Sequence, residues 1–170
     1  MKTLKMIGLM AMLCFIMPAF VSCDTDDDDP KGEKPETVEA ILGTYTGSLD
    51  YSVMNFEPGN IEGTYEVKII KDANDADEVM VVLPECSFTP PIPQSSSFTI
   101  PSLTIDDVDV TVDGNVYYIS EDDLSVELNG TAYTGKLTGT IAGKDAKIKF
   151  TLRPGRMPMD INFTFTGTLK

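Results

Sequence analysis

The side chains of this chain that could do chemistry are its cysteines and its many carboxylates. A thiol such as that of Cys86 needs a nearby base to act as a nucleophile, and the chain has no histidine. The same absence removes the commonest general base, the Ser-His-Asp triad and zinc sites built on imidazole. Two carboxylates could cleave a glycosidic bond, but the acidic residues gather in predicted turns rather than on facing strands. We therefore expect no catalytic residue, no metal site and no cofactor, and we interpret Cys86 as a buried, inert thiol.

The most acidic segment of the predicted globular part runs from Lys71 to Glu78 and is rich in oxygen ligands. An EF-hand calcium loop requires glycine at its sixth position and glutamate at its twelfth. Counting from Asp72, these positions hold Asp77 and Leu83. The segment is therefore predicted to be a solvated acidic hairpin rather than a calcium site.

Cys23 differs from the other cysteines because of the sequence on either side of it. A basic start is followed by an apolar run of 15 residues, Met6–Phe20, which is shorter than the roughly 20 residues that span a bilayer and typical of a cleaved signal. The arrangement resembles a bacterial lipoprotein, in which the cysteine after the cut is acylated. Val21-Ser22 fits the lipoprotein motif, whereas Phe20 stands where leucine is usual. The resemblance implies a signal peptide over residues 1–22 and a membrane anchor of palmitate or a related acyl chain on Cys23.

Residues 23–37 follow as an acidic tether. After the cysteine they read DTDDDDPKGEKPET, with two prolines and no apolar side chain, which predicts a disordered segment. The aspartate run resembles the export signal of surface-displayed lipoproteins in some Gram-negative bacteria. This resemblance implies an outer-membrane protein that faces the cell exterior. A plain flexible spacer remains the alternative.

The net charge limits the partners that the protein can have. The chain carries −14 in total, and −16 without residues 1–22, which hold two lysines and no acid. Nucleic-acid binding depends on neutralising phosphates with lysine and arginine, so we expect no nucleic-acid partner and no docking on anionic lipid headgroups. The acidity favours solubility at an exposed surface.

Residues 38–170 are predicted to be a single all-β domain, because apolar and polar residues alternate with a period of two. Turn signals rich in Gly, Asn, Asp and Pro separate the alternating runs, and a helical turn is expected before the first of them. Eight to ten short strands predict an antiparallel up-and-down barrel of about eight strands, with a two-sheet sandwich as the competing architecture. The clearest runs are 44–53, 61–69, 124–129, 146–152 and 161–170, and glycines suited to the bends of a small barrel lie at Gly47, Gly63, Gly139 and Gly167.

Several of these segments resemble the calycin-like β-barrel family of bacterial lipoproteins. The similarity is carried by the sequences at 41–49, 83–84, 103–111 and 163–169 and extends over 38–170. It implies a lipocalin-related barrel on a lipid anchor, without an established activity.

A barrel of about eight strands either is filled by its own side chains or holds one small ligand. Its inward positions include the aromatic residues Tyr45, Tyr51, Tyr65, Phe150, Phe163 and Phe165. We predict that these residues line an apolar ligand pocket, with a plugged barrel as the alternative. The proline-rich segment 89–101 is expected to be a lid over the barrel mouth, a recognition surface or an ordered connection.

The sequence thus predicts a non-enzymatic lipoprotein of the cell envelope that binds a small apolar or amphipathic ligand. The alternative is an interaction or adhesion module that holds a glycan or protein through its loops.

Overall fold

The structure is a computed structural model that describes residues 38–170, apart from 55, 74, 76 and 92–93. The described residues belong to the second of the chain's two compact units, Glu33–Lys170. The predicted signal peptide, Cys23 and the predicted tether lie outside the described residues. No helix in the described part of the chain combines the length and the hydropathy needed to cross a membrane.

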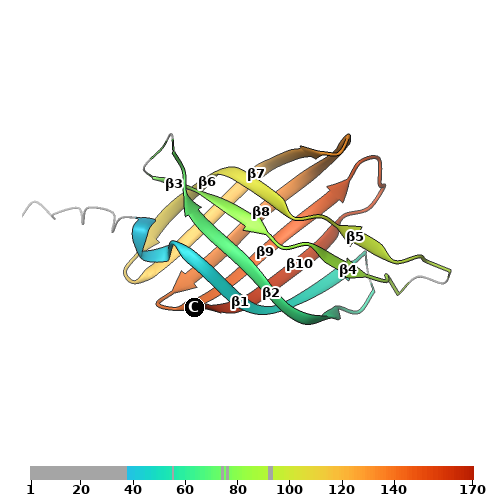
Figure 1. Ribbon diagram of the computed structural model, residues 1–170, viewed down its shortest axis with the longest axis horizontal. Helices are drawn as coiled ribbons and strands as arrows, with labels where there is room; N and C mark the ends of the chain where they lie inside the picture. The colour runs from blue at the N-terminus through green and yellow to red at the C-terminus, as the bar shows by residue number, and fades with distance from the viewer. Residues whose placement is uncertain (1–37, 55, 74, 76, 92–93) are drawn as a thin grey trace, which may run out of the picture. The chain divides into compact units, whose positions relative to one another are not determined.

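Eight strands form one closed antiparallel barrel (Figure 1). Each strand pairs with its neighbours in chain order, and the last strand closes on the first. This topology confirms the predicted up-and-down barrel of eight strands and excludes the two-sheet sandwich. A short hairpin, β4–β5, is inserted between β3 and β6. The strands are β1 (Gly43–Val53), β2 (Gly59–Lys71), β3 (Glu78–Leu83), β4 (Cys86–Phe88), β5 (Phe98–Ile100), β6 (Leu103–Asp113), β7 (Val116–Leu128), β8 (Thr131–Ala142), β9 (Asp145–Pro154) and β10 (Ile161–Leu169).

The apolar member of each alternating pair points into the barrel. β9 shows this most clearly, because Ala146, Ile148, Phe150 and Leu152 are buried and Lys147 and Lys149 are exposed. Antiparallel strands with one face on the core and one face in water produce this pattern. The turn signals also act as expected: Asn129 and Gly130, between β7 and β8, have φ angles of 52° and 73°, which suits the tight hairpin turns favoured by an Asn-Gly pair.

Two of the strand glycines lie where the barrel closes. Gly47 on β1 is paired with Gly167 on β10, and a Cβ atom added to Gly47 would lie 2.0 Å from the Thr166 carbonyl oxygen and 2.4 Å from the Gly167 Cα. Such a contact is far inside the van der Waals distance. The sequence therefore allows a close approach of the first and last strands that no side chain would permit.

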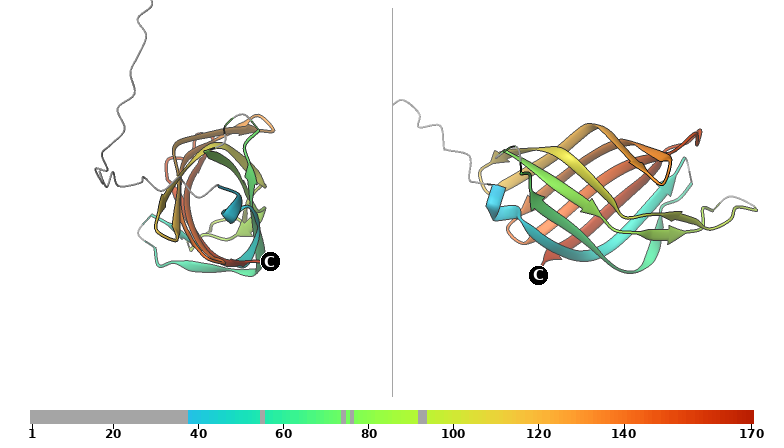
Figure 2. Two further views of the ribbon diagram at one scale, coloured as in Figure 1. Left: turned by 90° about the vertical axis from the view of Figure 1, so that its left-hand side faces the viewer. Right: turned by 45° about the horizontal axis from the view of Figure 1, so that its top comes forward.

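The two ends of the barrel are covered differently (Figures 1 and 2). A short 3-10 helix, η1 (Val38–Ile41), lies across one end, which we call the helix end, with Val38 and Ile41 buried. There the hydroxyl of Tyr45 donates a hydrogen bond of 2.9 Å to the Ile41 carbonyl oxygen. The β4–β5 hairpin projects from the opposite end, which we call the hairpin end.

Candidate functional site

The candidate site is a small apolar cavity at the hairpin end. Its volume is about 90 Å³. Three segments that are distant in the sequence surround it: the end of strand β1, the connection from β9 to β10 with the first residue of β10, and the β4–β5 hairpin. It is lined by Val53, Pro90, Ser95, Phe98, Met157, Met159 and Ile161.

Three side-chain hydroxyl groups hold the hairpin in place: one bonds it to the barrel, one lies within it and one lies at its base. Tyr51 on β1 donates a hydrogen bond of 2.9 Å to the Thr89 carbonyl oxygen. Ser95 donates to the Pro90 carbonyl oxygen at 2.7 Å, so the one polar side chain of the lining is already bonded within the hairpin. At the base, Ser102 donates to the Leu83 carbonyl oxygen at 2.7 Å. The cavity is therefore left with an apolar wall.

A continuous set of aromatic rings connects the hairpin with the barrel interior. Phe88 on β4 is central: its ring centroid lies 4.5 Å from that of Tyr51 and 6.4 Å from that of Phe98. It also makes an edge contact with Phe163 at 5.7 Å, and Phe163 stacks on Phe150 at 4.9 Å. These separations lie in the favourable range for aromatic pairs, so the hairpin is attached to the core mainly by ring packing.

The structure brings three of the six predicted ligand-lining residues together. Tyr51 and Phe163 contact Phe88 near the hairpin end, and Phe150 stacks on Phe163. None of the six predicted residues is among those that line the apolar cavity. Tyr45 is fully buried at the helix end.

The other two predicted residues lie apart from this group. Tyr65 is half-buried on β2, where its hydroxyl bonds the Glu62 carbonyl oxygen at 3.1 Å. Phe165 is 0 % exposed, so no open space borders its ring. The role of the six aromatic residues in ligand binding stays a prediction.

The sequence did not point to two of the residues that line the cavity, Met157 and Met159, or to two exposed apolar residues at the same end, Met54 and Phe56. Met157 and Met159 follow the predicted turn Arg153–Gly155, and Met54 and Phe56 precede another predicted turn, Glu57–Asn60. Met54 is 60 % exposed and Phe56 39 % exposed. Apolar side chains are unusual in turns, and their concentration in two loops of the barrel is the sequence signal that could have identified this end.

The thiol at the base of the hairpin is not reactive. Cys86 is buried, and burial, with a smaller effect of the Glu85 carboxylate, raises its pKa to about 12. The thiolate, which is the nucleophilic form, is therefore scarce at neutral pH. This agrees with the interpretation of Cys86 as an inert thiol.

The acidic segment before β3 caps its own turn. The backbone N–H of Asp75 bonds an Asp72 carboxylate oxygen at 3.4 Å, and that of Asp77 bonds an Asp75 carboxylate oxygen at 2.9 Å. No group of three or more His, Cys, Asp or Glu side chains among the described residues is arranged to bind a metal ion.

This architecture is that of the calycin-like proteins. The family model of the calycin-like β-barrel domain matches residues 41–168, and the chain belongs to this family. No curated protein matches this chain.

Two solved structures are similar to this chain. A Bacteroides fragilis protein named as a "putative outer membrane protein" is 27 % identical with a TM-score of 0.64, over 76 % of this chain and 51 % of the other. The present chain therefore spans about half the length of that protein. A DUF4251 family protein from Bacteroides eggerthii is 17 % identical with a TM-score of 0.38, over 78 % of this chain and 83 % of the other.

Proposed function

We propose that the protein is a lipid-anchored, non-catalytic protein of the cell envelope that binds a small apolar or amphipathic ligand at the hairpin end of its barrel. The observation that carries the proposal is the apolar cavity between Val53, Phe98 and the two methionines of the β9–β10 connection. Apolar cavities stay dry and accept apolar guests. An amphipathic ligand could leave its polar group in water beside the exposed loop that contains Met54.

The size of the cavity suggests how larger ligands enter. Its volume of about 90 Å³ is below the 300–1,000 Å³ or so of ordinary ligand pockets. A ligand longer than a few atoms therefore requires the hairpin to move away from the barrel. Ring contacts and the single hydrogen bond from Tyr51 to the Thr89 carbonyl oxygen hold it there, and a bound apolar chain could replace the ring contacts.

The test of this site is a substitution that fills it. Val53→Phe adds a ring at a buried position that borders the cavity, so we expect it to abolish binding of an apolar fluorescent probe by the full chain in detergent-free nanodiscs. Val112→Phe is the matched control, because Val112 is half-buried on β6 near the helix end. Probe affinity that survives Val53→Phe, or an absence of probe binding by the parent protein, contradicts the proposed site.

The envelope location rests on Cys23 and its flanking sequence, and is supported by the name of the B. fragilis protein. We propose that palmitate or a related acyl chain on Cys23 holds the protein in the outer membrane of a Gram-negative bacterium, with the barrel on the cell surface. Cys23→Ser should remove labelling by radioactive palmitate and move the protein from the detergent phase to the aqueous phase. Labelling that persists in the serine variant would place the attachment elsewhere. Cys86→Ser provides the control, because Cys86 is buried.

One observation favours a second function, in which the loops of the hairpin end hold a protein or glycan partner. Met54 and Phe56 are exposed on the β1–β2 connection, and they are two of the four large apolar side chains that are exposed in the described part of the chain. If no apolar probe binds the parent protein, this exposed pair becomes the site to test, with Met54→Ser as the variant.

A further inference from the structure

The charges of the described barrel are strongly segregated. Residues 38–128 contain eighteen acidic and two basic side chains, whereas residues 129–170 contain two acidic and seven basic ones. The second group forms β8, β9 and β10, which are adjacent in the barrel. One wall of an otherwise acidic protein is therefore positive. We call the outward side of these strands, with Lys136, Lys147, Lys149 and Arg153, the basic wall.

The strand register arranges the basic wall in regular rows. Lys147 pairs with Thr140 on β8 and with Thr166 on β10. Lys149 pairs in the same way with Thr138 and Thr164. Each lysine thus stands between two threonines. Neighbouring strands lie about 4.8 Å apart and successive outward residues about 6.8 Å apart, which gives a ladder of ammonium and hydroxyl groups.

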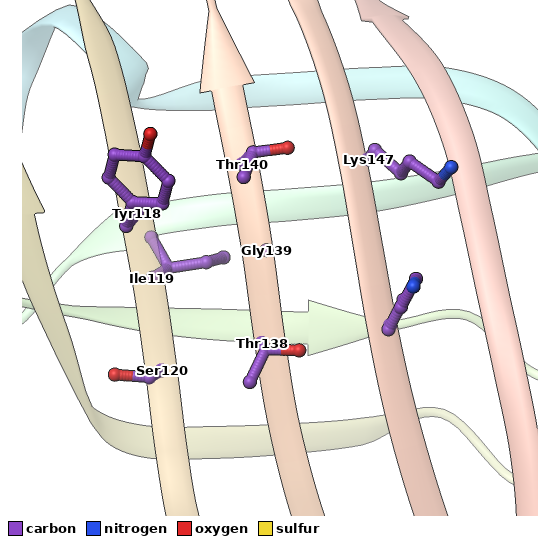
Figure 3. A pocket seen from close by; sticks show the side chains of 8 residues that line it. Tyr118, Ile119, Ser120, Thr138, Gly139, Thr140 and Lys147 are labelled. Atoms are coloured by element: carbon purple, nitrogen blue, oxygen red, sulfur yellow. The ribbon is translucent and has the colours of Figure 1, made fainter.

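The ladder continues onto β7 with an exposed aromatic ring. Tyr118 pairs with Thr140, and Ser120 pairs with Thr138. The Tyr118 side chain is 43 % exposed. Figure 3 shows Tyr118 and Lys147 on opposite sides of Thr140, with Thr138 below it.

Two shallow hollows follow the basic wall. The first, of about 380 Å³, extends from Tyr118 across Thr138 to Lys149. The second, of about 420 Å³, extends from Ala142 across Thr166 to Thr46, and its lining includes one carboxylate, that of Asp145. Both hollows include Thr140 and Lys147, so they are neighbours. We refer to the two together as the groove, and their lining residues come from five strands.

The central lysines of the wall are not neutralised by the protein. Among the described residues, the ion pairs of this region are Arg153 with Asp160 at 2.7 Å and Lys170 with Glu66. Lys136, Lys147 and Lys149 form no ion pair within the described part of the chain. Their ammonium groups are exposed and available to an anionic partner.

We propose that the basic wall binds an anionic polysaccharide, that is, a sugar chain with carboxylate, sulfate or phosphate groups. The negative groups of such a polymer complement the lysines that form no ion pair. The threonines beside these lysines can donate hydrogen bonds to the sugar hydroxyls and accept hydrogen bonds from them. The Tyr118 ring offers an apolar face with a polar tip. A protein partner fits less well, because the cores of protein interfaces are depleted in lysine and rich in apolar side chains. A single-stranded nucleic acid needs several stacking rings, and the groove has one.

The experiment measures retention of the full chain, in detergent micelles, on immobilised polygalacturonate, with neutral dextran as the reference matrix. We expect binding to polygalacturonate that salt weakens. Lys147→Gln/Lys149→Gln should lower the affinity by roughly tenfold, because it removes two exposed ion pairs with the polymer, each of which contributes modestly. Lys68→Gln/Lys71→Gln removes the same charge from β2, outside the groove, and should change the affinity much less.

A second variant separates sugar recognition from simple charge attraction. Tyr118→Ala keeps every charge and should weaken binding to polygalacturonate without changing any binding to polyglutamate. The proposal is overturned if the two lysine pairs have equal effects or if the parent protein does not bind polygalacturonate. It is also overturned if polyglutamate, duplex DNA or phosphatidylglycerol vesicles bind more tightly, since the wall would then serve an acidic protein, a nucleic acid or a membrane. Unchanged melting temperatures would show that the variants are folded.

Discussion

At the scale of single residues, Phe163 best separates a packed interior from a ligand-lining surface. Its ring is 1 % exposed and stacks on Phe150. We expect Phe163→Ala to lower the free energy of unfolding by about 3–5 kcal/mol, because it leaves a cavity in a closed core. Urea unfolding followed by circular dichroism measures this loss.

The control for this substitution is an apolar residue on the outside of the barrel. Ile70 on β2 is exposed, so Ile70→Ala should change stability by no more than about 0.5 kcal/mol. If Phe163→Ala costs little stability and instead reduces the affinity for an apolar probe, Phe163 lines a ligand site, as the sequence analysis predicts for the interior aromatic residues.

At the scale of the elements, the hairpin end depends on one hydrogen bond that can be removed without changing a ring. Tyr51→Phe deletes the donor to the Thr89 carbonyl oxygen and keeps the contact with Phe88. The cost should be about 1 kcal/mol, together with faster amide hydrogen exchange in β4 and β5. Tyr65→Phe is the matched control, because its hydroxyl bonds within β2. Equal exchange in both variants would mean that Tyr51 does not hold the hairpin.

The barrel strands could be predicted from the sequence, whereas the docking of the hairpin could not. A strand such as β9 is specified locally, because each inward apolar residue alternates with an outward polar or charged residue. The glycines opposite each other at the closure, Gly47 and Gly167, were also expected to serve the bends of a barrel. Phe88 and Thr89, in contrast, meet Tyr51 across 37 and 38 residues of chain. No periodicity encodes such a contact.

The same distinction explains which parts of the candidate site were foreseen. Tyr51 and Phe163, which pack beside the site without lining the cavity, alternate in step with the core residues and could be assigned to the interior. Met157 and Met159 are in an irregular connection, where no repeating pattern says which way a side chain points. The basic wall could have been found from the uneven charge of residues 129–170, but its rows follow from the pairing of three strands.

At the scale of the whole molecule, the acidic side of the barrel should make stability depend on pH. Loss of solvation raises the pKa of Glu78 above its usual value, and the carboxylates of Asp75, Asp107 and Asp109 raise it further. A raised pKa means that the folded state binds the proton more tightly than the unfolded state. The contribution to stability is therefore complete below the unfolded pKa, near 4.5, and is lost as the pH rises through the folded pKa.

Glu78→Gln should consequently stabilise the protein at pH 7 and have little effect at pH 4, because it removes a negative charge that lies close to other carboxylates.

Glu66, on strand β2, is the opposite case. The Lys170 ammonium group donates a hydrogen bond to the Glu66 carboxylate and attracts its negative charge, and both effects lower the pKa of Glu66. Its stabilisation is present above the unfolded pKa and is lost as the pH falls, so Glu66→Gln should destabilise at pH 7. Urea midpoints at both pH values measure the two effects. Destabilisation by Glu78→Gln at pH 7 would contradict the prediction for that residue, because it would show that favourable interactions of the Glu78 carboxylate outweigh the repulsion by its neighbours.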